Sequence, residues 1–335
     1  FPLSQPGPYF AGKLDFTIVD SSRSNREIQV EIWYPAAPEA GVEKRTVKYD
    51  AAPDKSGAPY PLILTEHRSG RWIFEDHLVS HGFVMAIITV PDHADATNWD
   101  SQMLNWPRDF LFSLDQIASN PPGALKGLID TGRVGVTGYS FGGDISLTLA
   151  GVRIDPAAYL AHCAKRPVIT SKFGGEDGYH TGTCSLAGKW GEFSTLAGEK
   201  LTASSDGLWQ PLTDKRIKAV MPMAPSGTWL YGERGLAAAD RPMLIIASTE
   251  DEFTPYQVET KFLFEHLGTP NKSMITFIGK SHMMVDEMEP VTRLKHFVTG
   301  FFGYHLQGRT EFQKYVSQEY VSRFNDLYWG IYPGD

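Results

Sequence analysis

Short apolar runs alternate along this chain with longer amphipathic stretches. The runs have the length of strands and are rich in β-branched residues, whereas the stretches between them repeat apolar positions at helical spacing. Several runs in the middle of the chain are almost continuously hydrophobic, which is typical of strands covered on both faces. The predicted strands are Leu14–Val19, Ile28–Tyr34, Leu62–Glu66, Phe83–Val90, Arg133–Thr137, Ala219–Met223, Met243–Ala247 and Met274–Ile278.

The amphipathic stretches predict helices between these strands. Strand and helix then alternate, which favours right-handed crossovers and a mainly parallel sheet with helices on both faces. The first two runs differ, because the turn-rich segment Asp20–Arg26 between them predicts an antiparallel hairpin. We therefore expect an α/β protein with a mainly parallel, eight-stranded sheet. The predicted helices are Ile73–His81, Arg108–Ser119, Gly142–Ala150, Tyr256–Leu267 and Val291–Phe302.

One segment interrupts this alternation. Residues 153–215 show little periodicity and are rich in glycine. An irregular loop of that length is uncommon within a compact domain. We therefore expect an inserted cap with short elements of its own, placed over the site after the nucleophile helix and belonging to a single domain that spans residues 1–335. Aromatic residues of the tail, 311–328, recur at helical spacing and are expected to face the core.

Composition narrows the range of functions. The formal net charge is −8, so there is no basic field to neutralise phosphate groups, and a nucleic-acid partner is not expected. No apolar run reaches the length of about 18 residues that a membrane-spanning helix needs, so no membrane span is expected either.

The chain has two cysteines, Cys163 and Cys184, which excludes a metal site of the Cys-x-x-Cys type. Two states of this pair remain open, namely a disulfide that closes a loop in an oxidising compartment and two free thiols. A disulfide, together with a first residue, Phe1, that is not methionine, would favour a secreted or periplasmic protein.

The segment Gly138-Tyr139-Ser140-Phe141-Gly142 carries the clearest chemical signal. It follows a predicted strand and precedes a predicted helix, which is the context of a nucleophile elbow. Glycines are expected at its flanks because the turn is too tight for side chains there. The Ser140 hydroxyl would project at the carboxyl end of the strand, and the N–H of Phe141 would face a developing oxyanion. The alternative is an ordinary glycine-rich turn with a capping serine.

A serine nucleophile needs a general base, and the base needs an orienting carboxylate. His282 is the predicted base, because it lies in a loop directly after the last predicted strand, at the carboxyl edge of the sheet. Asp251 is the predicted acid, because it follows a strand and gives the chain order Ser, Asp, His. Its neighbours Glu250 and Glu252 are the competing acids.

Further groups would complete such a site. The second oxyanion donor is expected to be a backbone N–H of Arg68 or Ser69, in the loop after the third strand. The run Asp92-His93-Ala94-Asp95 is interpreted as a loop with capping acids, so neither a metal nor a cofactor is expected. Binding sites prefer apolar linings, and the expected pocket residues are Trp72, Tyr139, Trp229 and Met283.

These motifs together resemble those of bacterial esterases that are similar to platelet-activating-factor acetylhydrolase and are often labelled predicted dienelactone hydrolases. The resemblance covers nearly the whole chain, and it includes Val30–Ala36, Ser80–Val84, Arg133–Gly135 and Ser140–Gly143. It implies an α/β-hydrolase fold and ester hydrolysis. The chain departs from the family at Glu66-His67-Arg68, where the family usually has Ser-His-Gly.

The sequence thus predicts a serine esterase that hydrolyses carboxylic esters, in small molecules or polymers, through an acyl-enzyme. Hydrolysis of polyesters or aryl esters is an alternative with the same chemistry. A non-catalytic binding protein on a hydrolase scaffold is the alternative from another class. It is disfavoured because such proteins typically lose a member of the triad, whereas all three members are expected here.

Overall fold

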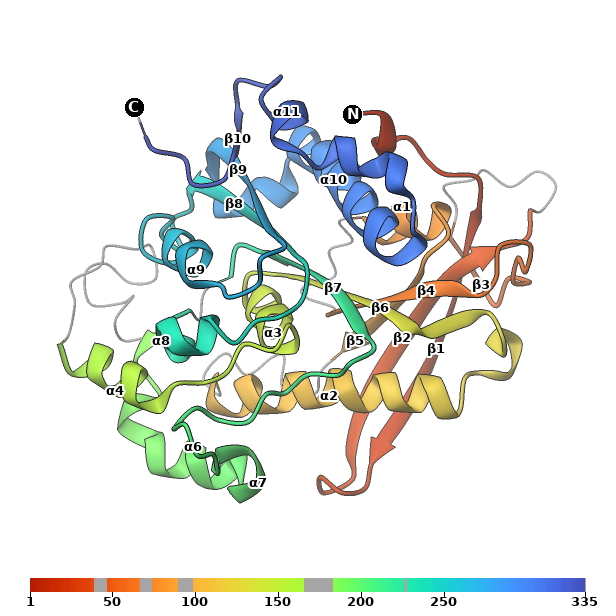
Figure 1. Ribbon diagram of the computed structural model, residues 1–335. Helices are drawn as coiled ribbons and strands as arrows, with labels where there is room; N and C mark the ends of the chain where they lie inside the picture. Colours follow the sequence, from red (N-terminus) through yellow and green to blue (C-terminus); the bar gives the residue numbers. More distant parts are fainter. Residues whose placement is uncertain (39–46, 67–73, 90–98, 166–182, 226–227, 335) are drawn as a thin grey trace.

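One mixed sheet forms the centre of the molecule (Figure 1). The computed structural model describes residues 1–38, 47–66, 74–89, 99–165, 183–225 and 228–334. Within these residues the sheet has ten strands, in the order β10-β9-β8-β7-β6-β4-β5-β2-β1-β3. The strands are β1 (Phe10–Asp20), β2 (Arg26–Ala36), β3 (Val47–Tyr49), β4 (Tyr60–Glu66), β5 (Val84–Thr89), β6 (Ile129–Tyr139), β7 (Ile217–Met223), β8 (Met243–Glu250), β9 (Lys272–Ser281) and β10 (Leu327–Trp329).

The sheet is largely parallel, so the predicted α/β class is confirmed. Strands β5, β4, β6, β7, β8 and β9 pair in parallel, in that order. The predicted hairpin is also present, because β1 and β2 pair antiparallel along their whole length. The expected number of strands was wrong: β3 and β10 have three residues each, which is too short to produce a hydrophobic period.

Helices lie between most of the strands. No helix among the described residues is long and apolar enough to cross a bilayer. The α-helices are α1 (Glu75–Ser80), α2 (Trp99–Ser119), α3 (Phe141–Leu149), α4 (Pro156–Lys165), α6 (Trp190–Ala197), α7 (Glu199–Thr202), α8 (Thr228–Leu236), α9 (Thr260–His266), α10 (Met288–Gln307) and α11 (Gln318–Val321). The 3₁₀ segments are η1 (Pro2–Ser4), η3 (Gly123–Leu125), η4 (Ala187–Lys189), η5 (His282–Asp286) and η6 (Thr310–Tyr315).

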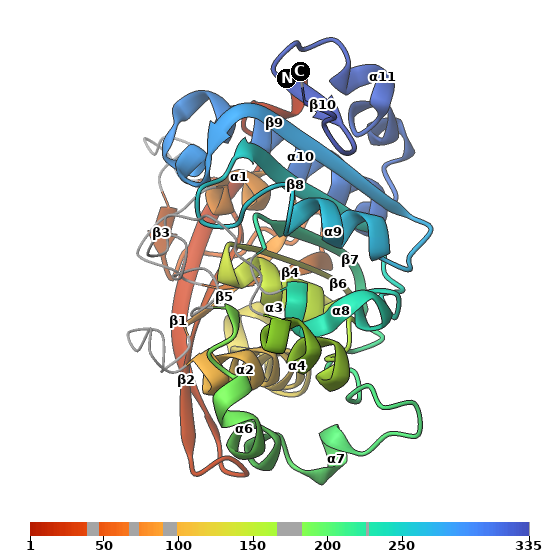
Figure 2. The same cartoon turned by 90° about the vertical axis from the view of Figure 1, so that its left-hand side faces the viewer.

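The central strands bury both of their faces, which explains their nearly continuous hydrophobic sequences. In β5, Val84 and Ala86 join the core that contains residues of α2 and α3. The intervening Met85 and Ile87 join the second core, which contains residues of α1 and α10. Because successive side chains of a strand point to opposite faces, these two cores lie on opposite sides of the sheet. Figure 2 shows α2 and α3 on one side of the sheet and α1 and α10 on the other.

Some predicted helix boundaries were wrong. Helix α2 begins at Trp99 and continues through Pro107, whereas the sequence predicted a start at Arg108. A proline inside a helix removes one backbone hydrogen bond, but buried Leu104 and Phe110 on either side of it stabilise the longer helix. The tail is not one helix either, because it divides into η6, α11 and β10.

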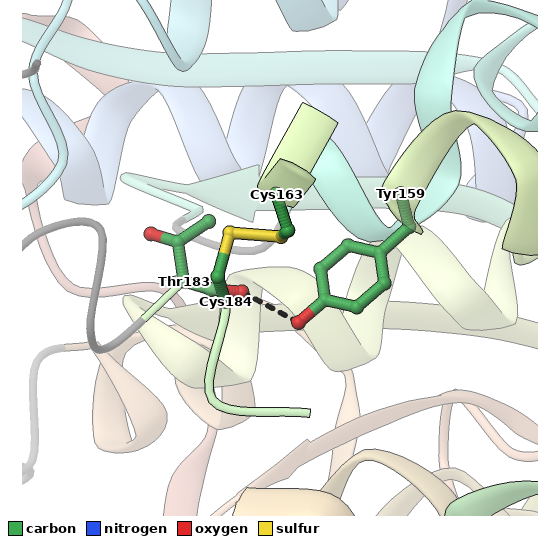
Figure 3. Close-up of a disulfide and its surroundings, with 4 residues drawn as sticks. All are labelled: Tyr159, Cys163, Thr183 and Cys184. Atoms are coloured by element: carbon green, nitrogen blue, oxygen red, sulfur yellow. Dashed lines mark hydrogen bonds between the residues drawn. A yellow bond between two sulfur atoms is a disulfide. The ribbon is translucent and has the colours of Figure 1, made fainter. Parts of the chain in front are cut away.

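The segment 153–215 contains short helices of its own, namely α4, α6 and α7. Of the two cysteine states that the sequence left open, the structure has the disulfide, which joins Cys163 of α4 to Cys184 (Figure 3). Beside it the Tyr159 hydroxyl donates a hydrogen bond to the carbonyl of Thr183, at 2.9 Å. The disulfide and this hydrogen bond attach the second half of the segment to α4. Its role as a cap over a site remains a prediction.

Two buried histidines hold the backbone of Leu3. The Leu3 N–H donates to Nδ1 of His296 at 3.0 Å, and its carbonyl accepts from Nε2 of His77 at 2.8 Å. Burial is the main cause that lowers the pKa of both His77 and His296 to about 3. Both imidazoles therefore stay neutral in the folded protein at pH values where an exposed histidine is protonated.

We expect the free energy of unfolding to decrease as the pH falls from about 6.5 towards 3, because the unfolded chain then binds protons that the folded chain excludes. Two such histidines give a slope of up to about 2.7 kcal/mol per pH unit. The variant His296→Asn keeps an acceptor for the Leu3 N–H without a titrating group, so its slope should be shallower. Chemical denaturation between about pH 5 and 6.5, where most carboxylates stay ionised, measures both slopes. Equal slopes would contradict the prediction.

Candidate active site

Ser140 lies at the sharp turn between β6 and α3. Its backbone has φ 58° and ψ −118°, a conformation that costs energy for a residue other than glycine. Two hydrogen bonds support it. The Ser140 N–H donates to the carbonyl of Met223 at the end of β7 (2.9 Å), and the Ser140 carbonyl accepts from the N–H of Gly143 (2.8 Å). The turn therefore places the serine at the carboxyl end of the parallel strands.

Close packing explains two glycines of this turn. A Cβ atom on Gly138 would lie 2.3 Å from the carbonyl oxygen of Gly142. A Cβ atom on Gly142 would lie 2.4 Å from Oε1 of Glu66, a buried residue at the end of β4. The backbone contact at Gly138 shows that the tight turn predicted by the sequence is present, whereas a side chain at Gly142 would require Glu66 to move.

The structure brings Ser140, His282 and Asp251 together. Nε2 of His282 lies 3.1 Å from Oγ of Ser140, across 142 residues of sequence. Nδ1 of His282 lies 2.9 Å from Oδ1 and 2.8 Å from Oδ2 of Asp251. An ionised carboxylate can only accept, so Nδ1 carries the imidazole proton and Nε2 is left to accept the serine proton.

The carboxylate of Asp251 is fixed by its own loop. Its Oδ1 accepts from the backbone N–H groups of Phe253 (3.0 Å) and Thr254 (2.7 Å). The side chains of Asp251 and His282 are only 2% and 7% exposed, so water competes little for their contact. Of the two competing acids, Glu250 is exposed, and Glu252 contacts the backbone of His282 instead of its ring.

Aromatic rings flank the His282 imidazole. The ring of Tyr139 lies 5.0 Å from it between centroids, and the ring of Phe253 also lies 5.0 Å from it. Both rings are tilted against the imidazole, by 43° and 52°. This packing limits rotation of the histidine side chain. Tyr139, which the sequence placed in a pocket, therefore lies against the predicted base, and Met283 directly follows that base in η5.

The expected oxyanion groups are described only in part. Phe141 is the first residue of α3, so its N–H belongs to the helix N-terminus beside Ser140. Its ring is buried against Trp106, with 4.8 Å between the centroids. The other expected donors, Arg68 and Ser69, lie outside the described residues, as does the predicted pocket residue Trp72.

Trp229, another predicted pocket residue, lies in a stack of rings from three helices. Its ring stacks on His162 of α4 at 4.1 Å and on Phe262 of α9 at 4.5 Å. All three residues line a cavity of about 380 Å³, which also has Asp155 and Arg234 in its wall. The indole ring of Trp229 is thus packed against rings of two neighbouring helices in the wall of this cavity.

Sequence reasoning missed the parts played by Glu252 and Phe253. The sequence indicates Glu252 only as a competitor of Asp251, and it indicates no role for Phe253. The one signal in the sequence is that both directly follow the predicted acid.

No group of three or more His, Cys, Asp or Glu side chains in the described part of the chain is arranged to hold a metal ion.

A scan of protein families found no match to the chain, and a search of curated proteins found none either.

Proposed function

We propose that the protein is a serine hydrolase of the α/β-hydrolase fold that cleaves carboxylic esters. The observation that carries this proposal is the continuous hydrogen-bonded chain from Oγ of Ser140 through His282 to Asp251. It begins at a strained strand-to-helix turn, and its members occur in the chain order serine, aspartate, histidine. Both features are typical of α/β-hydrolases.

The chemistry follows from this geometry. Oγ of Ser140 attacks the ester carbonyl carbon while Nε2 of His282 takes the hydroxyl proton. Asp251 stabilises the resulting imidazolium and does not itself take the proton. The tetrahedral oxyanion accepts a hydrogen bond from the N–H of Phe141 at the start of α3. The imidazolium then protonates the leaving alcohol, and water, activated by the same histidine, hydrolyses the acyl-enzyme.

The backbone strain at Ser140 argues against a non-catalytic scaffold protein. A left-handed conformation at a residue other than glycine costs about 1–3 kcal/mol, and such strain clusters at functional sites. A binding protein would gain nothing from a strained serine that is hydrogen bonded to a buried histidine, which is itself hydrogen bonded to a buried aspartate. The resemblance of Val30–Ala36 and Ser140–Gly143 to bacterial esterases supports esters as the substrate class.

Covalent labelling with a fluorophosphonate probe tests the proposal. We expect the folded protein to be labelled at one site, because only an activated serine attacks the phosphorus atom at a useful rate. Peptide mass spectrometry should place the label on Ser140, and heat-denatured protein serves as the control. Esters of p-nitrophenol, from acetate to palmitate, should then be hydrolysed with a preference that reports the size of the acyl site. A folded protein that neither reacts with the probe nor cleaves any ester would refute the proposal.

A further inference from the structure

We propose that Glu252 is a positioning residue for the base: it holds the backbone of His282 so that the imidazole stays aligned between Ser140 and Asp251. This inference rests on the proposed function and adds a fourth residue to the machinery of that site.

The contact that carries the inference is a hydrogen bond to the main chain. Oε2 of Glu252 accepts from the backbone N–H of His282, at 2.9 Å. His282 opens the 3₁₀ segment η5, and the first N–H groups of a helical segment have no partner within it. Oγ of Ser281 accepts the next of these, from Met283, at 3.2 Å. Two side chains therefore fix the first turn of η5, and the carboxylate acts on the residue that carries the imidazole.

Three consecutive residues of the loop between β8 and α9 contact His282. Asp251 binds Nδ1 of the ring, Glu252 binds the backbone N–H, and Phe253 packs against the ring. The ring contacts orient the imidazole but leave the position of its Cα atom to the main chain. The separation of 3.1 Å between Nε2 and Oγ of Ser140 depends on both. A displacement of about 1 Å at such a contact can cost about 100-fold in rate, so a group that fixes the backbone contributes to catalysis.

The reach of a glutamate suits this position. Strands β8 and β9 are parallel neighbours, and Glu250 pairs with Ser281 in their register. The acid-bearing loop and the histidine therefore leave adjacent strands at the same level, and a side chain from Glu252 spans the gap. Glu250, two residues earlier in the same acidic run, is exposed and provides a matched control.

Steady-state kinetics of three variants tests the inference. We expect Glu252→Ala to lower kcat for a p-nitrophenyl ester by about 10- to 100-fold at a nearly unchanged KM, because alignment and not substrate binding is lost. Glu252→Gln should recover most of this rate, since its amide oxygen can accept the same N–H. Glu250→Ala should behave like the wild type. The rate of labelling by the fluorophosphonate should follow the same order, and circular dichroism checks that each variant is folded.

The outcomes separate this inference from the proposed function. A wild-type rate in Glu252→Ala, with Ser140 still labelled, would overturn the positioning role and leave the proposed function intact. A raised KM at constant kcat would also overturn it, because Glu252 would then contact the substrate. A loss in Glu252→Ala that Glu252→Gln does not recover would mean that the hydrogen bond to His282 is not the cause. If the wild-type protein neither cleaves esters nor reacts with the probe, the proposed function fails and this inference fails with it.

Discussion

Replacement of Ser140 by alanine should lower kcat for ester hydrolysis by about 10⁴- to 10⁶-fold, the range expected when a nucleophile is removed from a triad. KM should change little, because the hydroxyl group reacts with the substrate and does not hold it. The background rate that remains would come from the oxyanion donors and from substrate binding alone. Parallel assays of purified wild-type and variant protein on one p-nitrophenyl ester measure the effect.

The backbone of Ser140 supplies a control for this experiment. Glycine adopts a φ near 58° without strain, so Ser140→Gly should be as inactive as Ser140→Ala but more stable than it, by about 1 kcal/mol. Denaturation with urea compares the two variants. Activity in Ser140→Ala close to that of the wild type would show that another residue is the nucleophile.

The replacement Asp251→Asn should lower kcat by about 10⁴-fold, because it moves the imidazole proton of His282 from Nδ1 to Nε2. Oδ1 of Asp251 accepts from the N–H groups of Phe253 and Thr254, so an asparagine must keep its oxygen there. Its NH₂ group then replaces Oδ2, the atom that lies 2.8 Å from Nδ1 of His282. An NH₂ group donates, so the closer of the two contacts then makes Nδ1 an acceptor, although the retained oxygen at Oδ1 also lies 2.9 Å from Nδ1, and the imidazole proton moves to Nε2. That nitrogen can no longer take the proton of Ser140.

The neighbouring acid provides the comparison for Asp251. Glu250→Gln removes one negative charge from the same acidic run but touches neither nitrogen of the imidazole, so it should keep the wild-type kcat. Steady-state assays of both variants separate the effect of the tautomer from that of net charge. If Asp251→Asn stays within tenfold of the wild type, Asp251 does not orient the base.

The sequence by itself determined the class of the fold, because that information is local. A strand buried on both faces must be hydrophobic at successive positions, as the central strands β4 and β5 are. All eight runs that the sequence predicted as strands, in the centre or not, are strands of the sheet. Gly138 is also a local signal, since the tight turn between β6 and α3 leaves no room for a Cβ atom there.

The sequence did not predict features that depend on burial, because the hydrophobic periodicity of a segment does not show what the segment packs against. The short strands β3 and β10 have no strand pattern in their own sequences. They form because they pair with the long strands β1 and β9. Helix α2 continues through Pro107 because apolar residues on both sides of the proline are buried. In each case packing against the rest of the molecule outweighs the local preference.

Only the tertiary structure decided how the candidate site is assembled. The sequence proposed Ser140, Asp251 and His282 from motif and chain order, but the contact between Ser140 and His282 spans 142 residues and exists only because β6 and β9 belong to one sheet. The same holds for the three adjacent acids. Their order in the chain is compatible with any of them facing the imidazole, and the loop after β8 turns Asp251 to the ring and Glu252 to the backbone of His282. Such a choice depends on backbone direction and burial, which a linear sequence does not contain.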